Sequence, residues 1–388
     1  MVWSNTAVRN GRAVFDYAVE HSLVLPVGAA IALVWANLDA DSYHTVASRL
    51  HFVVNDVGMV FFFALATKEI VEATAPGGAL HTWRRASLPG VAAVGGMIAP
   101  ALIYVLYVYA VGRRELLRGW AIPCATDIAF SYLVAKAIFR ARHPAVPFLL
   151  LLAIADDALG LVILAAFYPV GDLHLGVGAL LMAFAVGVAF MLRRNRIRLF
   201  WPYVIAGGSL SWTALFWGGL HPALALVPII PFLPHAARDP GLFVEAPPGA
   251  HDSLSAFEHW WKYPVQAVLF LFGFANAGVE IGRVEHGTWA VLLAILIGKP
   301  IGIGVAVTVA VALGLHLPHR LGWRDVVVTG CAAGIGFTVA LFFATAAFRP
   351  GPTLDAAKLG ALLSVTSAVV TLAAAATLRV GRFSAWRA

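Results

Sequence analysis

The sequence predicts an all-helical protein that crosses a membrane about twelve times. Of its 388 residues, 61% are apolar and 12% are charged, and this charged share is about half that of an average soluble domain. A membrane-spanning helix needs about 20 consecutive, mostly apolar residues, and continuous apolar runs recur along the chain. These runs do not alternate between polar and apolar residues as the strands of a membrane barrel do. Together the observations exclude a soluble enzyme, a disordered chain and a fibrous protein.

Twelve apolar segments, taken in order, are expected to form the spans, because polar residues or glycine and proline bound each run. The first six are Ser22–Leu38, Phe52–Ala66, Ala86–Val111, Trp120–Ile138, Val146–Phe167 and Leu175–Leu192. The second six are Leu199–Trp217, Leu220–Leu233, Trp260–Ile281, Trp289–Leu313, Val326–Phe348 and Asp355–Leu378. The eighth is short and rich in proline, which removes backbone hydrogen-bond donors, so it is the weakest helix prediction.

A single membrane domain is expected over residues 1–388, because the longest polar linker, His235–His259, is too short for a second domain. A net charge of +7 would suggest nucleic acid in a soluble protein, but here the basic residues are scattered between apolar runs. If the twelve segments alternate in direction, most Lys and Arg residues fall on the side that holds both termini, which predicts cytoplasmic termini. Met1–His21 has no apolar signal-peptide core. Cys124 and Cys331 are too few for a disulfide framework.

Four ionisable residues lie inside predicted spans: Asp127, Asp156, Asp157 and Lys299. Such residues cost about 2.5–3.5 kcal/mol each on insertion and are functional candidates by default. Asp156 and Asp157 are adjacent, and two like charges in a dry span cannot both stay ionised without a cation. The pair therefore binds protons or a small hard cation, for which oxygen ligands are suitable. The alternative is that the pair neutralises a lysine or caps a broken helix.

Lys299 is expected to form an ion pair with one of the two aspartates, and Asp156 is the favoured partner. A buried lysine keeps its charge only when a carboxylate lies beside it. The unpaired aspartate would then be the main ligand for a cation. The alternative is a lysine whose ammonium reaches the membrane interface.

Two spans contain helix-breaking residues at matching places. Pro123 interrupts the fourth span just before Thr126 and Asp127, which can cap a helix that restarts there. The eleventh span contains Gly330, Gly334 and Gly336 within seven positions. Broken helices in two halves are typical of a midplane binding site in inverted-repeat transporters. Asp127 would then offset the positive helix ends and Lys299 the negative ends, although close helix packing by the glycines and simple capping by Asp127 stay open.

Weaker candidates lie at the cytoplasmic ends of spans, where titrating groups could respond to pH. They are Lys68, Glu69, Glu72, His221, Glu258 and His259, and solvated helix ends are the alternative. None of the sequence motifs for zinc proteases, P-loops or serine hydrolases is present. The sequence therefore predicts a protein that is not an enzyme and needs no cofactor.

Several motifs together resemble the NhaA-type sodium/proton antiporter family, over about Asn55 to Ser367. They are Gly95–Ala101, Gly119–Phe130, Ala153–Asp157, Phe272–Val279, Gly298–Gly302, Gly334–Thr338 and Ala357–Gly360. The resemblance implies twelve spans in a bacterial inner membrane, an inverted repeat and crossed broken helices in the fourth and eleventh spans.

The resemblance also implies roles for individual residues. Asp157 would be the principal carrier of sodium and protons, with Asp156 as its partner and the counter-ion of Lys299. Thr126 and Asp127 would lie at the helix crossing. Lys299 would be linked to electrogenic exchange, with more than one proton per cation. Glu69, Glu258 and His259 match positions tied to the response to pH.

The sequence departs from the family pattern in three places. The usual Asp-Asp-Leu-Gly is Asp156–Gly160 here, with the glycine one place later. The charge pattern at Ala66–Ile70 differs, and Asp39–His51 is too short for the β-hairpin through which known members dimerise. A homodimer would need other contacts.

The function predicted is exchange of Na⁺ or Li⁺ for protons by alternating access, within the lipid bilayer, electrogenic and regulated by pH. Two alternatives use the same fold. One is a cation-coupled symporter of an organic anion, and the other is a membrane sensor that transports nothing.

Overall fold

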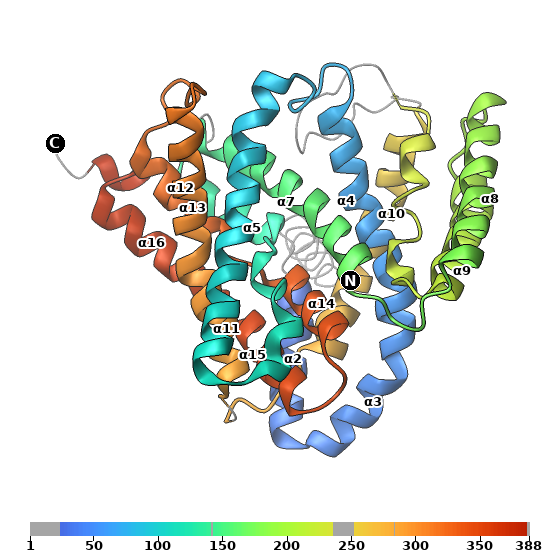
Figure 1. The fold of residues 1–388 in the computed structure, drawn as a ribbon, viewed down its shortest axis with the longest axis horizontal. Helices are drawn as coiled ribbons and strands as arrows, with labels where there is room; N and C mark the ends of the chain where they lie inside the picture. Colours follow the sequence, from blue (N-terminus) through green and yellow to red (C-terminus); the bar gives the residue numbers. More distant parts are fainter. Residues whose placement is uncertain (1–23, 141–142, 236–251, 283, 386–388) are drawn as a thin grey trace, which may run out of the picture.

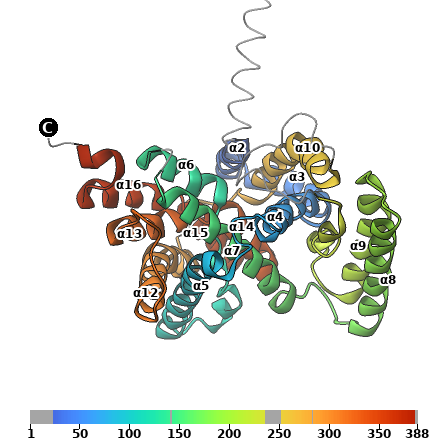
Figure 2. The same cartoon turned by 90° about the horizontal axis from the view of Figure 1, so that it is seen from above.

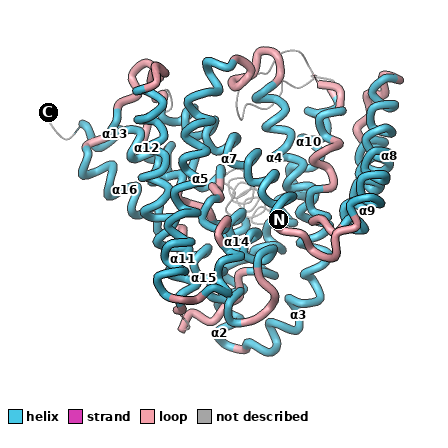
Figure 3. The backbone as a smooth tube through the Cα atoms, viewed as in Figure 1, coloured by secondary structure: helices cyan, strands magenta, loops and turns pink. Residues whose placement is uncertain are grey.

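The computed structural model describes residues 24–140, 143–235, 252–282 and 284–385. Within them all regular structure is helical, and the connections are mostly short (Figures 1 and 3). The all-helical architecture predicted from the sequence is thus confirmed for the described residues. The start of Ser22–Leu38 and much of the linker His235–His259 lie outside the described residues, as do several of the basic residues that set the predicted orientation.

The α-helices, labelled α, are interspersed with short 3₁₀ or π segments, labelled η. The first half has α2 (Val24–Leu38), α3 (Ala40–Phe52), η1 (Val53–Gly58), α4 (Met59–Thr74), α5 (Trp83–Val111), η2 (Arg114–Gly119), η3 (Ile122–Cys124), α6 (Ile128–Ile138), α7 (Ala145–Phe167) and α8 (Leu175–Arg194). The second has η4 (Tyr203–Gly208), α9 (Ser209–Gly218), η5 (Pro222–Leu224), η6 (Ile230–Phe232), α10 (Ser253–Asn276), α11 (His286–Leu293), η7 (Ala294–Gly298), α12 (Lys299–Ala312), α13 (Trp323–Ala333), α14 (Phe337–Ala347), α15 (Pro352–Leu363), α16 (Thr366–Leu378) and η8 (Gly381–Ala385).

Two predicted segments differ from the structure. Leu220–Leu233 contains only the 3₁₀ turns η5 and η6 rather than a regular helix, because its prolines remove the backbone donors that an α-helix needs. Asp39–His51, expected to be a loop, is almost entirely the helix α3. Its polar composition hides it from a search for apolar runs. Through η1 it joins α4 in one helical stretch of 35 residues.

Six helical stretches of the described chain are long and apolar enough to cross a membrane, or up to eight if each bent pair counts as one span. The other predicted spans fall short by length or polarity. The helix α2 has only 15 residues, and the first half of α10 carries Glu258, His259 and Lys262. Both cysteines are free and buried.

The two bent pairs are the spans in which the sequence predicted breaks. The segment Arg114–Cys124 meets α6 at 52°, and α13 meets α14 at 48°. The helix α7 runs through the middle of the molecule in both views, with α8 and α9 at one edge and α12, α13 and α16 at the other (Figures 1 and 2). The helix α7 and the half-helix α14 thus lie at the centre of the fold, and the site is built beside them.

The helices α5 and α12 touch through glycine. A Cβ atom added to Gly302 would overlap the carbonyl oxygen of Gly95, and one added to Gly298 would lie 2.6 Å from the Cα atom of Pro100. Small residues allow two backbones to approach this closely in membranes. The contact fixes the start of α12, and Lys299 is its first residue.

Replacing Gly302 with valine is expected to lower the unfolding temperature in detergent, because the side chain must displace the backbone of α5. Overpacking of this kind costs about 1–3 kcal/mol. The control is Gly304→Val on the same helix, where an added Cβ meets nothing within 4 Å. Equal unfolding temperatures for the two variants would contradict the close packing.

Candidate functional site

The helix α7 lies at the centre of the fold, and Asp156 and Asp157 are near the middle of its length. It forms because most of its 23 residues are Leu, Ala, Ile or Val, and the good helix formers Leu and Ala make up the majority. Successive side chains on an α-helix point about 100° apart. The two carboxylates therefore face different neighbours although they are adjacent in the chain.

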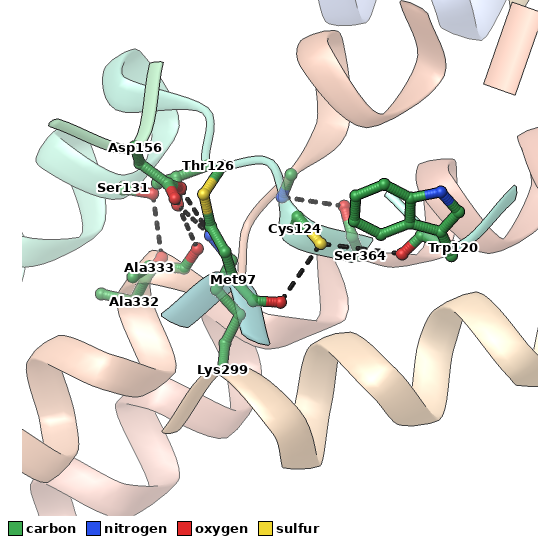
Figure 4. A network of polar contacts seen from close by, with 11 residues as sticks. Met97, Trp120, Cys124, Thr126, Ser131, Asp156, Lys299, Ala332, Ala333 and Ser364 are labelled. Carbon is green, nitrogen blue, oxygen red and sulfur yellow. Dashed lines mark hydrogen bonds and ion pairs between the residues drawn. The ribbon is translucent and has the colours of Figure 1, made fainter. Parts of the chain in front are cut away.

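Asp156 forms a buried ion pair with Lys299. The Lys299 Nζ atom lies 2.6 Å from Asp156 Oδ2 and 2.5 Å from the hydroxyl of Thr126. The exposed fractions are 3% for Asp156, 1% for Thr126 and zero for Lys299. Figure 4 shows these three side chains converging from α7, the break before α6 and the start of α12. The ion pair favoured from the sequence is thus present, and the alternative in which Lys299 reaches the interface is wrong.

The hydroxyl of Thr126 has one proton and two acceptors within reach. It lies 2.5 Å from Asp156 Oδ2 and 3.0 Å from the carbonyl oxygen of Ala333. A hydroxyl donates one hydrogen bond, so Thr126 serves either the carboxylate or the end of α13. The other oxygen of Asp156, Oδ1, is buried and has no hydrogen-bond partner among the described residues.

Asp157 faces a small cavity. Across the described chain its carboxylate has neither a hydrogen bond nor an ion pair. The cavity has a volume of about 20 Å³, enough for a single water-sized particle. It is lined by Phe62, Phe63, Ala66, Ala125, Asp156, Asp157, Gly160, Leu161, Leu164, Val339 and Phe343. The ionisable groups of this lining are thus the two adjacent carboxylates, and Asp157 is the one without a counter-charge among the described residues.

The two broken spans cross beside this cavity. The amide of Asp127 donates to the carbonyl of Ile335 at 2.6 Å, and the hydroxyl of Ser131 donates to that of Ala332 at 2.9 Å. Each break supplies groups that satisfy the backbone of the other, as irregular backbone inside a membrane requires. The crossing of broken helices implied by the resemblance is therefore present.

The carboxylate of Asp127 caps two half-helices at once. Its Oδ1 accepts from the amide of Phe130 in α6 at 3.3 Å, and its Oδ2 accepts from the amide of Thr338 in α14 at 3.1 Å. The Thr338 hydroxyl donates to the same oxygen. Helix N-termini carry partial positive charge, so the carboxylate offsets two of them. Asp127 is not part of the cavity wall.

A second charged group lies between α4 and α10. The ammonium of Lys68 is 2.6 Å from a carboxylate oxygen of Glu72, 2.7 Å from one of Glu258 and 3.4 Å from one of Glu69. Lys68 is buried, whereas His259 is exposed and takes no part in these ion pairs. On the same two helices, the rings of Phe61 and Trp261 are stacked, with their centroids 3.5 Å apart. One lysine thus joins three carboxylates across two helices.

The structure groups the predicted residues into two sets. Asp156, Thr126 and Lys299 form one network with Asp157 and Asp127 beside it, and Glu69 and Glu258 belong to the Lys68 group. His259 joins neither set.

Two further residues of the crossing had no role predicted from the sequence. Thr338 binds Asp127, and the hydroxyl of Ser364 accepts from the amides of Gly336 and Phe337. The polarity of Ser364 at the end of the apolar run 359–363 was the available signal.

Comparison with known proteins finds similar sequences over most of the chain. Residues 12–376 match the protein family described as Na⁺/H⁺ antiporter 1. The Na⁺/H⁺ antiporter NhaA 1 of Pelobacter propionicus is 46% identical over 373 residues, which cover 94% of this chain and 98% of the relative. The NhaA antiporter of Geobacter sulfurreducens is 46% identical over 372 residues, covering 94% and 97%.

Among solved structures, the sodium proton antiporter MjNhaP1 of Methanocaldococcus jannaschii has a similar fold. The TM-score is 0.54 at 13% sequence identity, and the alignment covers 97% of this chain and 98% of that one. At this identity the likeness concerns the fold alone.

Proposed function

This chain belongs to the Na⁺/H⁺ antiporter 1 family, and from that membership we propose that it exchanges sodium ions for protons across a bacterial inner membrane. Lithium is proposed as a second cation. No enzymatic step and no cofactor are proposed. The basic residues favour cytoplasmic termini, and a homodimer would have to use contacts other than a hairpin between the first two spans.

The observation that carries the proposal is the different environment of two adjacent carboxylates. Asp156 is neutralised by Lys299 at 2.6 Å, whereas Asp157 faces a cavity of about 20 Å³ without a counter-charge in the described chain. A buried carboxylate without a partner takes up either a proton or a cation. We assign Asp157 as the group that sodium and protons occupy in turn, and this competition couples the two fluxes.

The remaining residues take supporting roles in this proposal. Asp156 lines the same cavity and would share the cation through its unpaired oxygen. Sodium there would compete with Lys299 for Asp156, and this competition would link Lys299 to electrogenic exchange. Two protons per sodium ion would make the exchange electrogenic. Thr126 would move its hydrogen bond between Asp156 and Ala333, and Asp127 would keep the crossed half-helices together while the site alternates between the two sides.

Transport by purified protein in liposomes tests this function. With an acidic interior, Na⁺, Li⁺ or K⁺ is added outside and the internal pH is followed. We expect the interior of liposomes that contain the protein to become more alkaline when Na⁺ or Li⁺ is added. Protein-free liposomes should show no such change. If none of the cations dissipates the gradient between about pH 6 and 9, antiport fails. Sodium-driven uptake of an organic anion would then indicate a symporter.

We further propose that the Lys68 group contributes to the dependence of exchange on pH. Among single variants of Glu69, Glu258 and His259, Glu258→Gln should shift the pH of half-maximal exchange most. It removes the 2.7 Å ion pair between Lys68 and Glu258, which joins the group to α10. A partly exposed pair worth about 0.7 kcal/mol corresponds to about half a pH unit. Glu69→Gln, with a contact of 3.4 Å, should shift it less.

The exposed His259 supplies the control for this series. His259→Gln is expected to leave the pH profile unchanged, although the sequence placed it with Glu69 and Glu258. A shift for His259→Gln as large as that for Glu258→Gln would contradict the order that follows from the contacts.

A further inference from the structure

Ser364 lies at the junction of α15 and α16, behind the break in the eleventh span. Its side chain is completely buried, and its Oγ atom accepts hydrogen bonds from the amides of Gly336 at 3.3 Å and Phe337 at 3.1 Å. Figure 4 shows Ser364 reaching the break from the side away from Asp156 and Lys299. Its hydroxyl therefore caps a helix to which it does not belong.

The helix α14 needs an outside cap because its own sequence supplies none. Its N-cap residue is Gly336, which has no side chain to accept a hydrogen bond. The first amides of a helix have no partner within it, and here they are buried inside a membrane domain. Ser364 takes the first two amides and Asp127 takes the third, that of Thr338.

This division determines what Asp127 can do. With Ser364 in place, the Asp127 carboxylate divides its bonds between α14 and α6. Without the Ser364 hydroxyl, two more buried amides would lose their acceptor next to the Thr338 amide that Asp127 already binds. The carboxylate would be drawn toward α14, and the crossing of the half-helices would change.

The same junction controls one wall of the cavity. A Cβ atom added to Gly336 would lie 3.0 Å from the carbonyl oxygen of Ala125, so the two breaks are in direct backbone contact. Ala125 lines the cavity beside Asp157. A Cβ atom added to Gly334 would lie 2.9 Å from Ser367 Oγ. The α15–α16 junction therefore packs closely over the unwound segment. The hydrogen bond from Gly336 to Ser364 therefore helps to fix the position of Ala125, which lines the cavity.

We infer that Ser364 is a positioning residue of the cation site, which sets the affinity for sodium by fixing the N-terminus of α14 against Ala125 and Asp127. The inference rests on the proposed function. It assigns Ser364 no contact with the transported ion.

The test compares Ser364→Ala and Ser364→Cys with Thr366→Ala. Cysteine nearly keeps the size of serine but is a weak acceptor. Thr366 lies two residues away, and its hydroxyl donates to a carbonyl of the preceding turn, that of Leu363, at 2.7 Å. Exchange in liposomes gives the half-saturating sodium concentration and the maximal rate, and binding of radioactive sodium to the purified protein gives affinity without transport.

Both Ser364 variants are expected to raise the half-saturating sodium concentration about five- to tenfold, as the loss of one or two hydrogen bonds would. The maximal rate should change less, and Thr366→Ala should stay within about twofold of wild type. The inference is overturned if Ser364→Cys keeps the wild-type affinity, or if the Ser364 variants lose only thermal stability and maximal rate. If wild type itself neither binds nor exchanges sodium, it is the proposed function that fails.

Discussion

Asp157→Asn is expected to abolish sodium-driven proton movement in liposomes while the protein folds normally. Asparagine nearly keeps the size of aspartate but carries no charge and takes up no proton. Because the carboxylate faces a cavity and has no partner in the described chain, its removal leaves no other buried group unpaired. We expect internal pH traces that match those of protein-free liposomes with both Na⁺ and Li⁺, and an unfolding temperature close to that of wild type.

The matched control for this prediction is Asp56→Asn. Asp56 also lies within a long membrane helix, in the π-helical turn η1, but it is not part of the cavity wall. Exchange should persist in this variant. Exchange at nearly the wild-type rate by Asp157→Asn would show that another group carries the ions.

Lys299→Met is the second change with a large expected effect, and it acts first on stability. It leaves Asp156 buried without its counter-charge, with only Thr126 at 2.5 Å. Breaking a buried ion pair from one side costs about 3–5 kcal/mol. Thermal unfolding in detergent should therefore show a marked loss, together with a loss of electrogenic exchange.

The double variant Asp156→Asn, Lys299→Met should recover much of that stability. With both charges removed, no ion is left uncompensated, and replacement of a whole buried pair is often close to neutral. A double variant whose loss is the sum of the two single losses would contradict a direct pairing.

The charged positions of the site could be predicted from the sequence because they are costly. Four ionisable residues stand out in apolar runs, where such groups are costly to insert and usually serve a function. They are Asp127, Asp156, Asp157 and Lys299. The breaks were predictable for a similar reason. Pro123 and the glycines near Gly334 disfavour a regular helix through the middle of a span.

The distribution of roles within the site was only partly predictable. The sequence favoured Asp156 as the partner of Lys299, but the directions of two adjacent side chains depend on how α7 is rotated against its neighbours. The cap on α14 depends on a hydroxyl of Ser364, 28 residues away from Gly336 along the chain. No local pattern encodes such a contact.

The errors in the fold have local causes. The segment Leu220–Leu233 has the apolar composition of a span, but its prolines permit only 3₁₀ turns. The helix α3 has the composition of a loop, yet Asp39 caps its start through the amide of Ser42. In these two segments, helix capping and the supply of backbone hydrogen-bond donors, rather than hydropathy, determine the secondary structure.

Calorimetric titration of the purified protein with sodium tests the central claim, the competition of sodium and protons for Asp157, most directly. In two buffers that differ in ionisation enthalpy, it gives the number of protons released per sodium ion bound. The account predicts release of at least one proton per sodium ion in wild type, and neither binding nor release in Asp157→Asn. Sodium binding without proton release, or binding of wild-type strength by Asp157→Asn, would contradict it.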